Sequence, residues 1–134
     1  MNSHLIILLA EDNVGDVLLV REALREQAIE FEMFVAENGE KAVLLLDRLG
    51  REVPCPDLIL MDLNLPGVEG PELFKKVRAH PVCSEVPIIV VTSSDSPKDR
   101  AWTREFGVSH YFRKPSSYEE YMKLGSVVRE VVSA

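Results

Sequence analysis

The stretch Pro56-Asp57-Leu58-Ile59-Leu60-Met61-Asp62-Leu63-Asn64-Leu65-Pro66-Gly67 decides the fold. An uninterrupted apolar run this short, closed by a carboxylate and then by Leu-Pro-Gly, is typical of a strand buried on both faces of a parallel sheet. We therefore expect a strand that ends at Met61 and carries Asp62 into a loop at its C-terminal end.

The same pattern recurs on both sides of this strand. Apolar runs at 5–10, 31–36, 86–91 and 108–112 predict four further strands. The segments between and after them repeat apolar residues at helical spacing. Their expected first residues or caps are Asn13, Asn38, Pro71, Ser96 and either Ser116 or Ser117. Strands that alternate with helices five times predict an α/β fold, a doubly wound parallel sheet with helices on both faces.

The apolar side of each helix can be read from the same spacing. In the first helix, the residues expected to face the core are Val17, Val20, Leu24 and Ala28. In the fourth helix, they are Ala101, Trp102 and Phe106. The second strand is less apolar than the others, which suits an edge position.

Composition limits what kind of protein this is. The chain has 134 residues, of which 46% are hydrophobic and 28% charged, as expected for one soluble globular domain over 1–134. The net charge of −7 argues against nucleic-acid binding. No apolar run is long enough for a membrane span or a signal peptide, so we expect a cytoplasmic protein. Cys55 and Cys83 have no CxxC spacing and no nearby histidine ligand, and we expect them to be reduced.

Polar residues follow the predicted strands where each one ends. They are Glu11, Asp12, Asp62, Thr92 and Lys114. In a sheet of this kind ligands bind outside the carboxyl ends of the strands. Clustered carboxylates repel one another unless they take up a proton or a hard cation, and a set of oxygen ligands favours Mg²⁺. The sequence therefore predicts a site for a metal ion and a phosphoryl group.

With these motifs in this order, the whole chain resembles a response-regulator receiver domain, which has a flavodoxin-like fold with strand order 2-1-3-4-5. The resemblance implies that Asp62 is the phosphoacceptor. It also implies that Glu11, Asp12, Asp62 and the backbone carbonyl of Asn64 hold Mg²⁺, with Mn²⁺ as the alternative ion.

The resemblance assigns roles to further residues. Lys114, followed by a proline that commonly has a cis peptide bond in this family, would pair with the phosphoryl oxygens, and Thr92 would hydrogen-bond one of them. Thr92 and Tyr111 would form the conformational switch, while Asn64 and Ser94 would tune the lifetime of the phosphoryl group. The signal would leave through the surface of the fourth helix, fifth strand and fifth helix.

Three segments are similar to the stand-alone regulators that accompany bacterial phytochrome-type kinases: 11–17, 94–99 and 114–121. The implied partner is a sensor histidine kinase, here of the phytochrome type. The aromatic residues Trp102, Phe106, Tyr118 and Tyr121 are either core or part of a homodimer surface on the same region, and the sequence leaves monomer and dimer open.

Three other functions fit this sequence less well than a phosphoacceptor does. An aspartyl-nucleophile phosphohydrolase needs an acid two residues after its nucleophile, and that position is Asn64. A flavin- or nucleotide-binding module needs a phosphate-cradling loop where Glu11 and Asp12 stand. A receiver-fold interaction module that works without phosphorylation is the remaining alternative. We expect a single-domain signalling protein that catalyses only its own phosphorylation and slow dephosphorylation.

Overall fold

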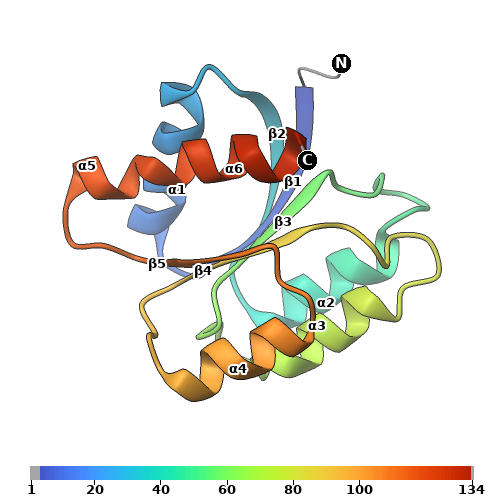
Figure 1. The fold of residues 1–134 in the computed structure, drawn as a ribbon. Helices are drawn as coiled ribbons and strands as arrows, with labels where there is room; N and C mark the ends of the chain where they lie inside the picture. The colour runs from blue at the N-terminus through green and yellow to red at the C-terminus, as the bar shows by residue number, and fades with distance from the viewer. Residues whose placement is uncertain (1–3, 134) are drawn as a thin grey trace.

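The computed structural model describes residues 4–133, and a five-stranded parallel sheet runs through its centre (Figure 1). The strands are β1 (His4–Ala10), β2 (Glu30–Ala36), β3 (Leu58–Met61), β4 (Ile88–Thr92) and β5 (His110–Arg113). The helices are α1 (Val14–Glu26), α2 (Gly39–Arg48), α3 (Gly70–Arg78), α4 (Pro97–Glu105), α5 (Tyr118–Tyr121) and α6 (Lys123–Ser133). The strand order is β2-β1-β3-β4-β5, which confirms the predicted fold and the edge position of the second strand.

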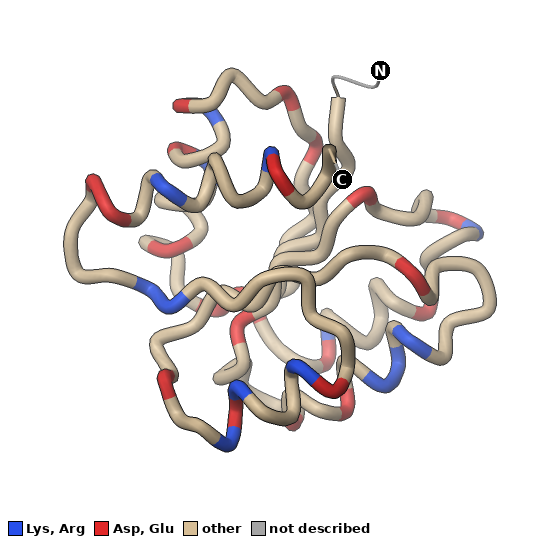
Figure 2. Tube along the Cα trace, in the orientation of Figure 1, with Lys and Arg blue, Asp and Glu red and all other residues tan. Residues whose placement is uncertain are grey.

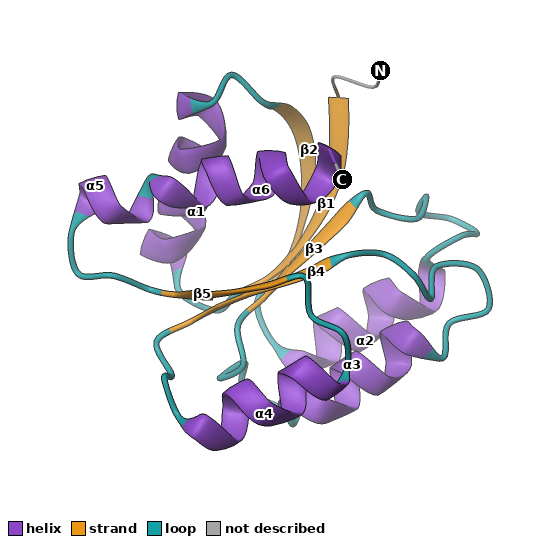
Figure 3. Cartoon of the chain, viewed as in Figure 1, coloured by secondary structure: helices purple, strands orange, loops and turns teal. Residues whose placement is uncertain are grey.

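Helices cover both faces of the sheet (Figure 3). α1, α5 and α6 lie on one face, and α2, α3 and α4 lie on the other. Successive side chains of a strand point to opposite faces, so Leu58 and Leu60 of β3 join one apolar core while Ile59 and Met61 join the other. All four are buried, as expected for a strand covered on both sides.

The predicted helix caps are present in the structure. The side chains of Asn13, Asn38, Ser96 and Ser117 each accept a hydrogen bond from a backbone N–H in the first turn of the helix that follows. Of the two serines considered for the last cap, Ser117 is the one used. Because these caps start helices directly after strands, they also fix the loops at the carboxyl edge of the sheet.

Two inward positions were predicted wrongly. α1 ends at Glu26, so Ala28 lies in the turn beyond it, exposed and with a positive φ of 55°. In α4, Ala101 is exposed, and Thr103 is the fully buried residue. The Thr103 hydroxyl donates to the Asp99 carbonyl at 2.7 Å, which satisfies it inside the core. Small residues such as alanine give little signal of a helix's end or of its buried face.

The last helix is divided into α5 and α6 at Met122. The Gly125 N–H donates to the Met122 carbonyl at 3.1 Å, a tight i→i+3 bond at the break. A side chain at Gly125 would collide with α1, because a Cβ there would lie 2.2 Å from the Ala23 carbonyl oxygen. Glycine at this position therefore lets α6 pack closely against α1.

The two cysteines form a disulfide, so the expectation of reduced thiols was wrong. Cys55 lies in the loop before β3 and Cys83 in the loop before β4, and their Cα atoms are 5.6 Å apart. β3 and β4 are neighbours in the sheet, which brings the loops that lead into them to the same edge. Because the cysteines are separated by 28 positions in the chain, this proximity is not visible in the sequence.

Charged residues of both signs are interspersed along the helices (Figure 2). Within residues 4–133, no helix is both long enough and apolar enough to cross a bilayer.

Candidate functional site

Backbone hydrogen bonds carry the sheet ladder one residue past three strands. The Glu11 N–H donates to Ala36 O at 2.9 Å, and the Asp62 N–H donates to Ala10 O at 3.0 Å. The Lys114 N–H donates to Thr92 O at 2.7 Å. These bonds hold Glu11, Asp62 and Lys114 on one rim at the carboxyl edge of the sheet.

The Lys114 ammonium lies at the centre of this rim. Its Nζ is 2.9 Å from Glu11 Oε1, from Asp62 Oδ2 and from Asp16 Oδ2, so all three N–H donors have a carboxylate acceptor. Burial alone would lower the pKa of Lys114, but the bonds to the three carboxylates outweigh it and raise the pKa. The lysine is therefore cationic throughout the physiological pH range.

Three carboxylates lie beside this lysine in an arrangement that fits a metal ion. Glu11, Asp12 and Asp62 each offer an oxygen, and these oxygens lie within 4.8 Å of one another. Glu11 and Asp62 are buried and Asp12 is exposed. Burial raises the pKa of Glu11 to about 7, although Lys114 acts in the opposite direction. Keeping these clustered carboxylates charged is costly without a cation. Because all the ligands they offer are oxygens, the cluster suits Mg²⁺ or Mn²⁺.

The loop after β3 is fixed beside these carboxylates. The Asn64 N–H donates to Asp62 Oδ1 at 3.0 Å, which closes a tight turn from Asp62 to Asn64. The second oxygen of Asp62 is the one that Lys114 binds. The turn therefore orients the Asp62 carboxylate and keeps the Asn64 backbone next to it.

Of the residues predicted for the switch, Thr92 is the last residue of β4 and Tyr111 lies within β5. Thr92 is fully buried, and its Oγ1 accepts from the Ser94 N–H at 3.3 Å. The Tyr111 hydroxyl donates to the Ser94 carbonyl at 2.8 Å, and the Arg100 guanidinium lies 4.3 Å from the centre of the Tyr111 ring. The Ser94 hydroxyl donates to Asp99 Oδ2 at 2.6 Å, so this side chain is bonded to α4. The β4–α4 loop thus connects Thr92 to Tyr111 and to α4.

The Lys114–Pro115 peptide bond is trans, as are all peptide bonds among the described residues, so the cis bond implied by the resemblance was wrong. Trans is the lower-energy isomer even before proline. Lys114 continues the ladder from β5, and its side chain reaches the carboxylates.

Sequence reasoning missed two residues of this site. They are Asp16 in α1 and Tyr121 in α5. A chain of hydrogen bonds runs from Asp62 to Lys114, from Lys114 to Asp16 and from Asp16 to Tyr121. The Tyr121 hydroxyl donates to Asp16 Oδ1 at 3.0 Å. Asp16 stands in the first turn after the Asn13 cap, which was a weak signal that it lies on the rim. Nothing in a single sequence pairs it with a tyrosine 105 residues away.

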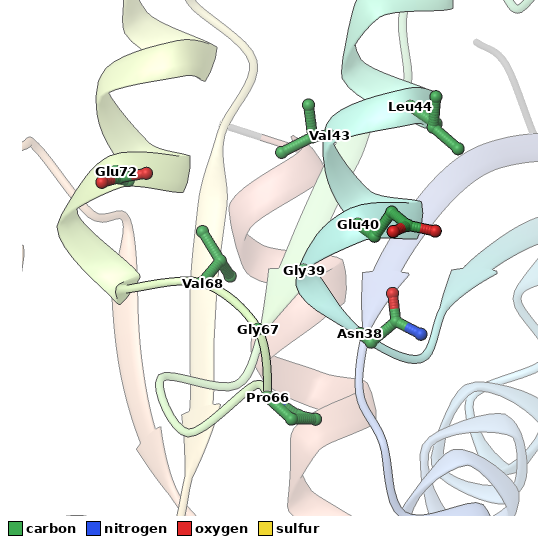
Figure 4. Close-up of a pocket in the computed structure, with 9 residues that line it drawn as sticks. All are labelled: Asn38, Gly39, Glu40, Val43, Leu44, Pro66, Gly67, Val68 and Glu72. Carbon is green, nitrogen blue, oxygen red and sulfur yellow. The ribbon is translucent and has the colours of Figure 1, made fainter.

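A separate hollow of about 570 Å³ lies between α2 and the loop that leads into α3 (Figure 4). Its lining residues are Asn38, Gly39, Glu40, Val43, Leu44, Pro66, Gly67, Val68 and Glu72. The Gly39 N–H donates to Pro66 O at 2.7 Å, and a Cβ at Gly39 would lie 2.5 Å from Val68 Cβ. The hollow is lined by none of the residues that surround Lys114.

Comparisons with known proteins agree with this geometry. The family model described as "Response regulator receiver domain" matches residues 7–124. The response regulator Rcp1 of Synechocystis sp. is 32% identical over 125 residues, which cover 92% of this chain and 85% of Rcp1. The transcriptional regulatory protein TrcR of Mycobacterium tuberculosis is 33% identical over 85% of this chain, which spans only 41% of TrcR.

Solved structures of two relatives superpose closely. The phosphorylated cyanobacterial phytochrome response regulator RcpA gives a TM-score of 0.86 at 28% identity, covering 98% of this chain and 95% of RcpA. The Mn²⁺-bound form of Rcp1 gives a TM-score of 0.83 at 30% identity, covering 94% of this chain and 92% of Rcp1.

Proposed function

This chain belongs to the response-regulator receiver family of two-component signalling proteins, and we propose that Asp62 accepts a phosphoryl group from a sensor histidine kinase in a reaction that requires Mg²⁺. The observation that carries the proposal is the position of the Lys114 ammonium, 2.9 Å from carboxylate oxygens of both Asp62 and Glu11. A fixed cation beside a buried carboxylate is suited to a nucleophile that must receive a dianionic phosphoryl group.

In the proposed reaction an Asp62 oxygen attacks the phosphorus as the P–N bond of the kinase phosphohistidine breaks. The Lys114 ammonium then forms an ion pair with the phosphoryl oxygens, and the Thr92 hydroxyl donates a hydrogen bond to one of them. A cation held by Glu11, Asp12, Asp62 and the Asn64 carbonyl would neutralise charge on the transferring group. Rcp1 has been solved in a Mn²⁺-bound form, which supports the binding of a divalent ion by this chain.

The proposed output is a change in the surface formed by α4, β5 and the α5–α6 segment. Thr92 would move toward the phosphoryl group and Tyr111 would follow, since both are bonded to the Ser94 backbone. Asn64 and Ser94 would set how long the phosphoryl group persists. A homodimer through this surface, or another protein docked on it, would read the change.

The likeness to RcpA, a cyanobacterial phytochrome response regulator, supports a phytochrome-type kinase as the partner. We propose residues 1–134 as one receiver domain of a cytoplasmic signalling protein, without turnover of other substrates. Asn64 stands where an aspartyl phosphohydrolase needs its second acid, which supports this role over that of a hydrolase.

The test is intact-mass analysis after incubation with acetyl phosphate and Mg²⁺. We expect one added phosphoryl group on the wild-type protein and none on Asp62→Asn or in the presence of a chelator. Asp47→Asn, which changes an exposed aspartate on α2, should be phosphorylated like the wild type.

The oligomeric state is read from the same samples by light scattering. A change in mass on phosphorylation would locate the output in self-association. An unmodified wild-type protein in every condition would contradict the phosphoacceptor role and favour a receiver-fold interaction module.

A further inference from the structure

The Lys114 ammonium has a third acceptor that belongs to no metal site. Asp16 Oδ2 lies 2.9 Å from Lys114 Nζ, as close as the oxygens of Glu11 and Asp62. Asp16 comes from α1 and is absent from the group of carboxylates that could share a cation. It therefore binds the lysine without competing for the cation.

Asp16 is itself held in place from α5. Its other oxygen, Oδ1, accepts from the Tyr121 hydroxyl at 3.0 Å, and Tyr121 is only 2% exposed. A buried hydroxyl keeps its hydrogen bond because losing it leaves an unsatisfied polar group. With each oxygen bonded to a different partner, the Asp16 carboxylate has a fixed orientation between α5 and Lys114.

This arrangement matters because lysine has a long, flexible side chain. If Glu11 and Asp62 gave oxygens to a cation, Lys114 would have to share two of its three acceptors with that cation. Asp16 is the acceptor that remains, and it would keep the ammonium on the rim where the incoming phosphoryl oxygens arrive.

We propose that Asp16 is a positioning residue for Lys114 and that Tyr121 acts through Asp16, so that a single hydrogen-bond chain connects the phosphoacceptor to α5. The inference rests on the proposed function of Asp62 and extends it to a residue pair outside the metal site.

The first test compares the rate at which acetyl phosphate modifies the wild-type protein and Asp16→Asn at saturating Mg²⁺. We expect a reduction of about 10-fold, the lower end of the losses seen when residues that orient metal ligands are removed. Glu26→Gln is the matched control, because it removes one exposed negative charge from the same helix and should leave the rate unchanged.

Tyr121→Phe tests the second step of the chain. It should slow phosphorylation in the wild-type background but have no further effect in the Asp16→Asn background, because the hydroxyl acts only through Asp16. Tyr118→Phe, on the exposed side of the same helix, is its control. Lysine ammonium ¹H–¹⁵N NMR gives a direct readout: the Lys114 signal, assigned with Lys114→Arg, should broaden in Asp16→Asn through faster proton exchange.

Two results would overturn the inference while leaving the proposed function intact. One is an equal rate of Asp62 phosphorylation in the wild-type protein and in Asp16→Asn. The other is a rate loss in Tyr121→Phe that adds fully to that of Asp16→Asn. A wild-type protein that is never phosphorylated would contradict the proposed function itself, and the NMR signal would still report whether Asp16 orders the Lys114 ammonium.

Discussion

Asp99 is the residue that joins the β4–α4 loop to the first turn of α4. One of its carboxylate oxygens accepts from the Ser94 hydroxyl at 2.6 Å, and the other accepts from the Trp102 indole N–H at 3.0 Å. Its own N–H donates to the Ser96 hydroxyl at 3.0 Å, the helix cap. The surface proposed to carry the signal is therefore ordered around one ionised side chain.

This network makes stability depend on pH in a defined direction. The hydrogen bond from Ser94, helped by that from Trp102, lowers the pKa of Asp99 below its ordinary value of 3.8. A lowered pKa in the folded state means that the contribution to stability is present above the ordinary value and is lost as the pH falls through the folded-state pKa. We expect urea unfolding followed by Trp102 fluorescence to show a loss of stability below pH of about 4 that is smaller in Asp99→Asn.

The control for this prediction is Asp47→Asn, which should keep the wild-type pH profile because Asp47 is exposed on α2. Identical profiles for Asp99→Asn and the wild type would contradict the assignment of this acid-sensitive step to Asp99.

Residue-level chemistry was predicted where a short-range rule governs it. Ser96 was recognised as a cap from its position before Pro97, and the structure shows its hydroxyl accepting from Asp99 N–H. The bond between the Ser94 and Asp99 side chains follows no such rule, so it could not be predicted. The Asp16–Tyr121 pair was missed for the same reason, because it depends on how α1 and α5 pack.

At the scale of elements, the sequence located each strand to within a few residues but not the contacts between loops. The run 58–61 was predicted as a buried strand, and its four residues are buried. Cys55 precedes β3 and Cys83 precedes β4, so both lie at the opposite edge of the sheet from Asp62. Only the adjacency of those two strands brings the cysteines together. A pattern within one strand carries no information about this adjacency.

The disulfide should contribute measurably to stability. It closes a loop between residues separated by 28 positions. Constraining a loop of that size in the unfolded chain is worth about 3.5 kcal/mol. We expect dithiothreitol to lower the free energy of unfolding of the wild-type protein by about this amount, measured by urea denaturation. The Cys55→Ser/Cys83→Ser double variant should unfold at the same urea concentration with and without reductant.

A thiol titration under denaturing, non-reducing conditions checks the pairing directly. It should find no free thiol in the oxidised wild-type protein. Two reactive thiols together with unfolding that is insensitive to reductant would show that the cysteines are unpaired in solution.

The whole molecule consists of two apolar cores separated by the sheet, and its polar chemistry collects where the strands end. Strands buried on both faces leave no position for Asp62 except beyond their last residue, which is why this aspartate could be identified from the sequence. The same arrangement concentrates negative charge, because Glu11, Asp12 and Asp62 share one rim of a chain whose net charge is −7. The Lys114 ammonium, which pairs with Glu11 and Asp62, compensates part of this negative charge.

A cation bound at this rim should therefore stabilise the whole domain. A ligand that binds only the folded state adds about 1.4 kcal/mol at ten times its Kd. We expect Mg²⁺ to raise the Tm of the wild-type protein in a concentration-dependent way, measured by differential scanning calorimetry in chelator-treated buffer. In Asp12→Asn the rise should be much smaller, because this exposed carboxylate is part of the cluster but does not contact Lys114.

Asp12→Asn should also be more stable than the wild type without Mg²⁺, since one repelling charge is gone. An equal Mg²⁺ effect in both proteins, with Asp47→Asn as the charge-matched control, would mean that the ion binds elsewhere and that the carboxylates are stabilised by Lys114 alone.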